Sequence, residues 1–188
     1  HSNRAVSLQE RQAELLREKI KGLELKAAEM IRHGVENTAI GDKLQRWTRE
    51  LLFTREAREL PAVVAREIAA QFQVPQVAIK VWGVSPEFAA EPYVQGASDD
   101  VMAFASSLTL PYCGANPGLE AAQWLGDPAS VASIALVPLR AGIAPQAFGM
   151  LVLASADPQR FAADMGTDFL ERIGELTSAA LSRLRPID

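Results

Sequence analysis

Two residues that could bind a ligand stand close together in the stretch VAIKVW, residues 77–82. The alternation of a β-strand would place the aliphatic side chains on one face, and Lys80 and Trp82 on the other. We expect the aliphatic face to pack on helices. A lysine is almost never buried without a partner, so Lys80 should contact an anionic ligand group, pair with an acidic residue of the domain, or lie on an open face.

The only cysteine of the chain, Cys113, lies in LPYCGANPG, residues 110–118. It is either a pocket thiol or redox sensor, or a small buried hydrophobe beside a turn. Tyr112 and Trp124 flank the same region, where they either line a pocket or pack in the core. Ser133, the first residue of a later predicted strand, joins them as a candidate. The full set of ligand-pocket candidates is Lys80, Trp82, Tyr112, Cys113, Trp124 and Ser133.

Groups that perform catalysis or hold metals are scarce in this sequence. His1 and His33 both precede residue 60, so the rest of the chain offers no imidazole to a metal or haem. That part also lacks a Ser/His/Asp set, a glycine-rich phosphate loop and a paired metal-ligand motif. Asp99 and Asp100 are most simply the N-terminal cap of a short helix. We therefore predict no enzymatic activity, no metal and no cofactor.

The distribution of charge separates two parts of the chain. Residues 1–59 hold 12 Lys/Arg and 10 Asp/Glu, a net charge of +2, whereas residues 60–188 hold 7 and 13, a net charge of −6. An acidic main domain argues against a nucleic-acid surface, because phosphate neutralisation needs a basic patch. No apolar run approaches the ~18 residues that span a membrane, and a single cysteine fits a reducing compartment. We predict a cytoplasmic protein without nucleic-acid or membrane partners.

Residues 8–58 have the composition of one long helix. Pro is absent before position 61, and Leu, Glu, Arg, Lys, Gln and Ala dominate. Apolar residues spaced alternately three and four positions apart are typical of a coiled-coil seam. A helix of this length would extend roughly 75 Å, which is more than a small domain can cover. We therefore predict a homodimer. Its seam is the stripe that recurs every seven residues, namely Leu16, Leu23, Met30, Asn37, Leu44 and Leu51.

Asn37 on this stripe allows two interpretations. A buried Asn on the seam would fix the register of the two helices. Alternatively, the helix breaks at Gly34 or Gly41, and Asn37 caps the piece that follows.

The remaining sequence predicts an α+β domain at residues 60–188, preceded by the helical dimerisation segment at residues 1–59. The last two predicted strands can pair as a hairpin. The flanking helices can cover one face of an antiparallel sheet and the small helices the other. The expected elements are a helix at 60–72, strands at 77–82 and around Tyr93, a helix at 100–107, a turn-rich stretch at 111–118, a helix from Asn116-Pro117 to 125, strands at 133–139 and 147–154, and a helix at 164–184.

The final hairpin and the corner after it resemble the end of a GAF domain. GAF domains are small-molecule-binding sensory modules related to PAS domains. The resemblance covers residues 60–184 and implies an antiparallel sheet flanked by helices. It rests on Ser133-x-Ala-x-Val-Pro-Leu139, Gly149-x-Leu-x-Leu153, Asp157-Pro-x-Arg-Phe161 and a closing amphipathic helix.

A second resemblance spans nearly the whole chain, to the bacterial family catalogued as domain of unknown function 484. That family implies a GAF-like fold behind a helical N-terminal region, and it implies no activity, because none is assigned to it. More sequence usually precedes this point in the family, so a chain that begins HSNRAV, without Met, is expected to be a fragment. The matching segments are AVSLQERQ at 5–12, CG at 113–114, QWL at 123–125, SIALVPL at 133–139 and SADPQRFAADMGTDFL at 155–170.

Three functional hypotheses follow. The first is a non-enzymatic sensory or regulatory module that binds an unidentified small molecule and dimerises through its N-terminal helix. The second is a ligand-free scaffold, a GAF fold with a filled pocket that binds a protein partner. The third, an enzyme, is disfavoured because a clustered nucleophile, base and metal set is missing. Specialised GAF chemistries are disfavoured too, since sulfoxide reduction needs several cysteines and the bilin and cyclic-nucleotide motifs are absent.

Overall fold

The N-terminal element is one uninterrupted helix in the computed structural model, which describes residues 7–187. This helix, α1 (Leu8–Phe53), begins with a capping box in which Ser7 Oγ accepts from the Glu10 amide and Glu10 Oε2 accepts from the Ser7 amide, each at 3.1 Å. It continues through Gly34 and Gly41, so the interpretation in which it breaks there is wrong. No helix of the described chain, α1 included, combines the length and the apolar character that a bilayer crossing requires.

The chain divides into two compact units between Asp42 and Lys43. The described part of the first unit is helix α1 as far as Asp42. The second unit includes the last turns of α1, where Trp47 and Leu51 are buried. Trp47 Nε1 donates a hydrogen bond to Val64 O at 3.3 Å. These last turns therefore pack within the domain that follows.

Helix α1 ends at Phe53, earlier than the predicted residue 58. Thr54 Oγ1 donates to Glu50 O at 2.8 Å, and a 3₁₀ turn at Ala57–Glu59 leads into α2 (Leu60–Phe72). The bounds of α2 are those predicted. Pro61 lies in its first turn, where the missing amide hydrogen has no helical partner to lose.

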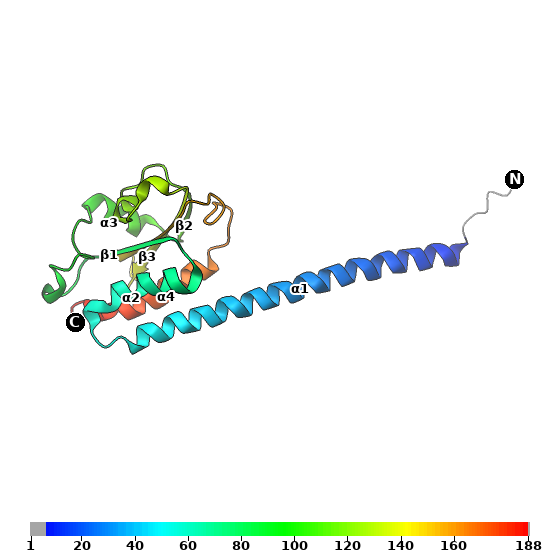
Figure 1. Ribbon diagram of the computed structural model, residues 1–188, viewed down its shortest axis with the longest axis horizontal. Helices are drawn as coiled ribbons and strands as arrows, with labels where there is room; N and C mark the ends of the chain where they lie inside the picture. Colours follow the sequence, from blue (N-terminus) through cyan, green and yellow to red (C-terminus); the bar gives the residue numbers. More distant parts are fainter. Residues whose placement is uncertain (1–6, 188) are drawn as a thin grey trace. The chain divides into compact units, whose positions relative to one another are not determined.

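A four-stranded antiparallel sheet forms the centre of the second unit (Figure 1). The predicted pairing of the last two strands as a hairpin is confirmed, with Ser133 opposite Ser155. The spatial order β1-β4-β3-β2 leaves β1 at one edge and β2 at the other. The strands are β1 (Gln76–Val81), β2 (Tyr112–Ala115), β3 (Ser133–Arg140) and β4 (Ala147–Ser155).

Helices cover both faces of the sheet, as the sequence predicts (Figure 1). On one face lie α2 and α4 (Asp168–Leu181), and on the other lie α3 (Asp99–Ser107) and a 3₁₀ segment at Glu120–Trp124. The alternation expected for β1 is confirmed. Val77, Ile79 and Val81 join the core beside α2 and α4, whereas Ala78 and Trp82 join the core beside α3.

The stretch around Tyr93 is a turn, and the strand predicted there is wrong. Glu91 O accepts from the Val94 amide at 2.9 Å, which closes a helical turn. Pro92 has no amide hydrogen to donate to a strand ladder. One contact of the strand type is present, because the Val81 amide donates to Tyr93 O at 2.9 Å.

Residues 111–125 also differ from the prediction. Residues 112–115 form the edge strand β2, which small residues and neighbouring turn residues concealed in the sequence. Asn116 Oδ1 accepts from the amides of Gly118 at 3.1 Å and Leu119 at 3.0 Å, so it closes a turn and does not cap a helix. The helix that follows is of the 3₁₀ type at Glu120–Trp124.

Two helix starts need smaller corrections. Ser98, and not the pair Asp99-Asp100, caps α3, because its Oγ accepts from the Val101 amide at 3.1 Å while both acids lie in the first turn. Helix α4 begins at Asp168, where residue 164 was predicted. Beyond Leu181 the chain continues as a 3₁₀ turn, Ser182–Leu184.

Candidate functional site

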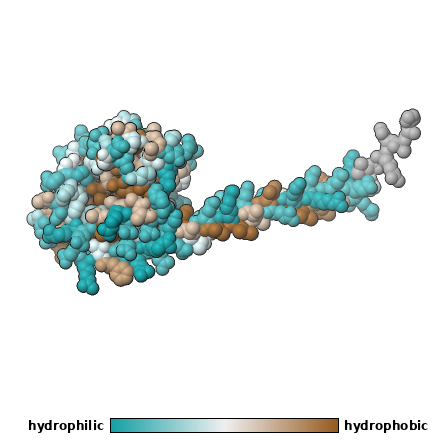
Figure 2. All heavy atoms as spheres, viewed as in Figure 1, coloured by the Kyte–Doolittle hydropathy of each residue, from teal (hydrophilic) through white to brown (hydrophobic). Residues whose placement is uncertain are grey.

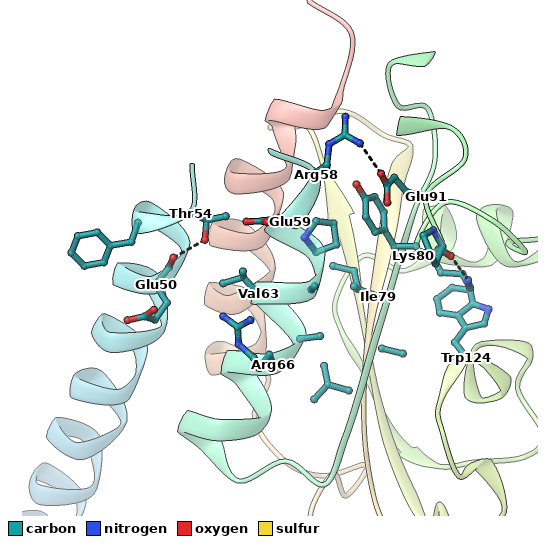
Figure 3. A pocket seen from close by; sticks show the side chains of 18 residues that line it. Glu50, Thr54, Arg58, Glu59, Val63, Arg66, Ile79, Lys80, Glu91 and Trp124 are labelled. Carbon is teal, nitrogen blue, oxygen red and sulfur yellow. Dashed lines mark hydrogen bonds and ion pairs between the residues drawn. The ribbon is translucent and has the colours of Figure 1, made fainter. Parts of the chain in front are cut away.

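Lys80 is held by the backbone of a neighbouring loop. Its Nζ donates to Gln95 O at 2.6 Å and to Pro92 O at 3.2 Å, and it lies 5.8 Å from the centre of the Trp124 ring (Figure 3). Within residues 7–187 no acidic side chain forms an ion pair with it. Burial lowers the pKa of its ammonium group. Carbonyl oxygens thus take the place expected for a carboxylate, and one of the three N–H donors is left for a ligand.

Trp82 and Tyr112 pack on the α3 side of the sheet. Trp82 Nε1 donates to Ala147 O at 2.8 Å, and the Tyr112 hydroxyl donates to Ala115 O at 3.0 Å. Both side chains are half-buried among aliphatic residues of that face. Their polar atoms are therefore bonded within the chain.

Cys113 lies on the opposite face of the sheet from its neighbour Tyr112. Consecutive residues of β2 alternate, and Cys113 packs against the core beside α2 and α4. Burial raises the pKa of its thiol. A raised pKa lowers the thiolate fraction, which is the reactive form. Because Cys113 lies on the side of the sheet covered by α2 and α4, the structure does not bring it together with Lys80.

Ser133 joins two segments of the chain and is 1% exposed. Its Oγ donates to Asp157 O at 2.6 Å and accepts from the Phe161 amide at 3.2 Å. In the same corner, Arg160 Nη2 donates to Phe72 O at 2.6 Å and so binds the C-terminal end of α2. The Asp-Pro-x-Arg-Phe motif and Ser133 thus fix the corner between β4 and the closing helix.

The α3 face of the sheet, where Lys80 and Trp82 were expected to line a pocket, is filled by side chains. A cavity of about 180 Å³ on this side lies between α3 and the 3₁₀ segment, lined by residues such as Val101, Phe104 and Leu119. Ligand pockets usually have about 300–1,000 Å³. The buried side chains of this face are Val101, Ala105, Ala121, Ala122, Leu125, Ile134, Leu136, Ala147, Met150, Val152 and Ala154.

An open cleft of about 990 Å³ lies beside the edge strand β1. Its walls are α2, β1, residues 91–93 and the last turn of α1 within the second unit (Figure 3). Lys80 and Trp124 line this cleft. Trp82, Tyr112, Cys113 and Ser133 do not. The cleft also has cations and acids on its walls, among them Arg66 and Glu59.

Three residues of the cleft were not predicted from the sequence as site residues. Arg58 and Glu91 form an ion pair of 3.1 Å, and the Tyr93 hydroxyl is buried beside them without a hydrogen-bond partner among the described residues. Burial and then the charge of Glu91 raise the pKa of Tyr93 to about 12, while Arg58 acts in the opposite direction. No local pattern marks these residues, because they meet only when residues 91–96 fold as a turn.

The predicted dimer residues fall into two groups. Leu16, Leu23, Met30 and Asn37 are exposed on α1. Leu51 is 5% exposed in the core of the domain, and Leu44 packs against the same core. Only the first group is therefore available to a second chain.

The cleft is suited to binding. Within residues 7–187, no three His, Cys, Asp or Glu side chains are grouped to hold a metal ion. The cleft walls instead offer charges of both signs, the aromatic ring of Trp124 and the aliphatic edge of β1. Such a mixture provides contact area and orientation for a bound partner.

A family model described as "Protein of unknown function, DUF484" matches residues 1–185. The chain belongs to this family. The resemblance noted in the sequence is thereby confirmed. No curated protein matches this DUF484 chain.

Solved GAF domains share the fold of the DUF484 chain. The GAF domain of a proposed sensor histidine kinase from Pseudomonas syringae pv. tomato is 20% identical, with a TM-score of 0.53, and the match covers 81% of this chain and 91% of that one. The GAF domain from Acinetobacter phosphoenolpyruvate-protein phosphotransferase is 16% identical, with a TM-score of 0.52, and covers 78% and 96%. The predicted α+β fold, a GAF-like antiparallel sheet with flanking helices and a long N-terminal helix, is confirmed.

Proposed function

We propose that this DUF484 chain is a non-enzymatic regulatory module that dimerises through residues 8–42 of α1 and binds a protein partner through its GAF-fold domain. The observation that carries the proposal is the exposed apolar stripe of α1 (Figure 2). Leu16, Leu23 and Met30 recur every seven residues and are 60%, 56% and 74% exposed. A stripe with this period is stabilised by burial against a second helix.

The size of the stripe supports a coiled-coil dimer. Residues 8–42 extend roughly 50 Å at 1.5 Å per residue. Ile20, four residues after Leu16, is also exposed and widens the seam. Full burial of each such apolar side chain would contribute about 1.5–3 kcal/mol to the free energy of dimer formation. In this arrangement Asn37 would pair with its own copy and fix the register of the two helices.

The filled α3 face favours a protein partner for the domain. Side chains of the sheet, α3 and the 3₁₀ segment occupy the volume that a small molecule would need there. A GAF fold without a pocket on this face can still present its surface to another protein. This is the scaffold hypothesis derived from the sequence.

Small-molecule sensing in the cleft beside β1 is the second candidate. The cleft volume of about 990 Å³ is large enough for a small ligand. Lys80 keeps one N–H donor for an anionic group and lies next to the Trp124 ring. The filled α3 face leaves this cleft open, because the cleft lies beside the edge strand β1.

The side-chain chemistry supports a non-catalytic role. Burial raises the pKa of Cys113, the only thiol, whereas a nucleophilic cysteine needs a lowered pKa. The sequence beyond His33 contains no imidazole to serve as a general base.

Native mass spectrometry of the purified chain, followed by denaturation and identification of any released molecule, tests this proposal. A dimer without an adduct, from several expression hosts, is the expected result. A dimer that carries one small molecule per chain would replace the protein-binding role by the sensing role. A monomer would contradict the proposed dimer.

A further inference from the structure

The edge strand β1 has one side free of the sheet. The Trp82 amide donates to Phe148 O of β4 at 2.7 Å, whereas the Val81 amide points the other way and donates to Tyr93 O at 2.9 Å. Backbone groups of successive strand residues alternate in direction. The N–H and C=O groups of Val77 and Ile79 therefore point away from β4, towards the free edge.

These outward backbone groups have no partner in the described chain. Within residues 7–187, neither Val77 nor Ile79 makes a backbone or side-chain hydrogen bond on the side away from β4. Both residues line the cleft. Unpaired backbone groups at an open sheet edge are a template for a further strand.

A continuous groove follows this edge. The cleft of about 990 Å³ adjoins a second cavity of about 360 Å³, and the two share Ala65, Arg66 and Val77. Small side chains such as Ala65 form the α2 wall, and Trp124 and Gly126 stand on the opposite wall. The groove therefore has room for a backbone along the edge and for short side chains above α2.

Lys80 does not shield the part of the edge beside Val77 and Ile79. Lysines often guard exposed edges, but the ammonium of Lys80 is bound to the carbonyl oxygens of Pro92 and Gln95. Its charge is thereby drawn to the far end of the groove. The stretch beside Val77 and Ile79 stays open.

Charge selects the occupant of the groove. Arg66 lines both cavities and is the only charged residue lining the smaller one. Its Nε donates to Glu67 Oε1 at 3.4 Å, but its side chain is 64% exposed, and the N–H groups of its two Nη atoms are left for a further acceptor. A second copy of this edge would bring a second Arg66 to the groove, and like charges repel. An extended segment with an acidic side chain beside Arg66 is complementary.

We propose that the free edge of β1 binds an extended segment of a partner protein as a fifth strand, through the backbone of Val77 and Ile79 and with an acidic residue of the segment beside Arg66. This inference rests on the proposed protein-binding role and names its site. Main-chain hydrogen bonds would supply affinity, and the groove walls would select the side chains.

A phage-displayed library of short random peptides, selected on the full chain, tests the proposal. We expect the enriched peptides to contain an acidic residue. Val77→Pro removes one outward N–H while keeping the bonds to β4, and it should weaken these peptides about tenfold. Ala65→Arg would fill the groove with a long side chain, and we expect it to abolish peptide binding. Ala70→Arg, exposed on α2 and outside both cavities, should leave binding unchanged.

Charge reversal and amide exchange complete the test. Arg66→Glu should replace the acidic preference by a basic one. Exchange on the wild-type chain should slow at the amides of Val77 and Ile79 when peptide is added, which tests the site even if Val77→Pro does not fold.

Three results would overturn the proposal. The first is that no peptides are enriched. The second is that Val77→Pro and Ala65→Arg bind the peptides as tightly as the wild type does. The third is that Val77→Pro dissociates a dimer, which would assign the edge to a second copy. Loss of the dimer through α1 with peptide binding intact would instead contradict only the dimerisation part of the proposed function.

Discussion

Ser133 holds the start of β3 to the corner after β4, through Asp157 O and the Phe161 amide. Replacing its hydroxyl would leave the buried Phe161 amide without a partner. We expect Ser133→Ala to lower the free energy of unfolding by about 1–3 kcal/mol, measured by urea denaturation. The matched control is Ser85→Ala, because the Ser85 side chain makes no capping hydrogen bond. Equal stabilities of the two variants would contradict the structural role of Ser133.

The Tyr93 hydroxyl predicts a pH dependence of stability. Its pKa is raised from 10.0 to about 12, chiefly by burial. The unfolded chain loses this proton near pH 10, so stability that is present below pH 10 is lost as the pH rises towards about 12. We expect Tyr93→Phe to lose less stability than the wild type between about pH 10 and about pH 12, measured by urea denaturation. Parallel losses in both proteins would show that the phenol is not buried.

The residue-scale predictions from sequence were limited by distance along the chain. The face of Lys80 was predictable, because strand alternation is a local property. Its acceptors were not, since the carbonyl oxygens of Pro92 and Gln95 reach it through a turn that the sequence suggested as a strand. Cys113 and Tyr112 were grouped as neighbours in sequence, yet β2 places them on opposite faces.

At the scale of elements, the contact between β1 and β4 depends on Gly149. A Cβ at this position would lie 2.9 Å from Lys80 O and from Val81 Cγ1. We expect Gly149→Ala to lower the free energy of unfolding by about 1–3 kcal/mol, because strand backbones would have to separate. Gly126→Ala, where a Cβ meets only open space, is the control. Thermal denaturation of both variants measures the difference, and an unchanged Gly149→Ala would contradict the close approach.

Elements with a strong period were predictable, and short elements were not. Helix α2 was predicted with its observed bounds, because an apolar stripe and Pro61 define it. Strand β2 has only four residues at a sheet edge, and its sequence shows no alternation of apolar and polar residues. The turn after Glu91 is closed by backbone hydrogen bonds, which leave no periodic pattern in the sequence. The sequence around Tyr93 was therefore interpreted as a strand.

At the scale of the whole molecule, the fold was predictable and the cleft was not. The hairpin and the Asp-Pro-x-Arg-Phe corner carry local signals, which the contacts of Ser133 and Arg160 explain. The cleft joins the end of α1, α2, β1 and the loop at 91–93. No single segment of the sequence predicts this cleft, because its walls come from four separate segments that meet only in the folded chain.

The central claim for the whole molecule is a dimer joined by α1. Leu23→Asp would place a charge in the apolar seam. Leu25→Asp makes the same change at a residue that is 65% exposed, but about 200° around the helix from Leu23 and therefore off the seam. Both variants leave the domain untouched, so they separate the seam from general effects of added charge.

Sedimentation equilibrium of the wild type, Leu23→Asp and Leu25→Asp at matched concentrations is the most direct measurement. We expect the wild type and Leu25→Asp to sediment as dimers and Leu23→Asp as a monomer. A Leu23→Asp protein that remains dimeric, or a wild type that is monomeric, would contradict dimerisation through α1.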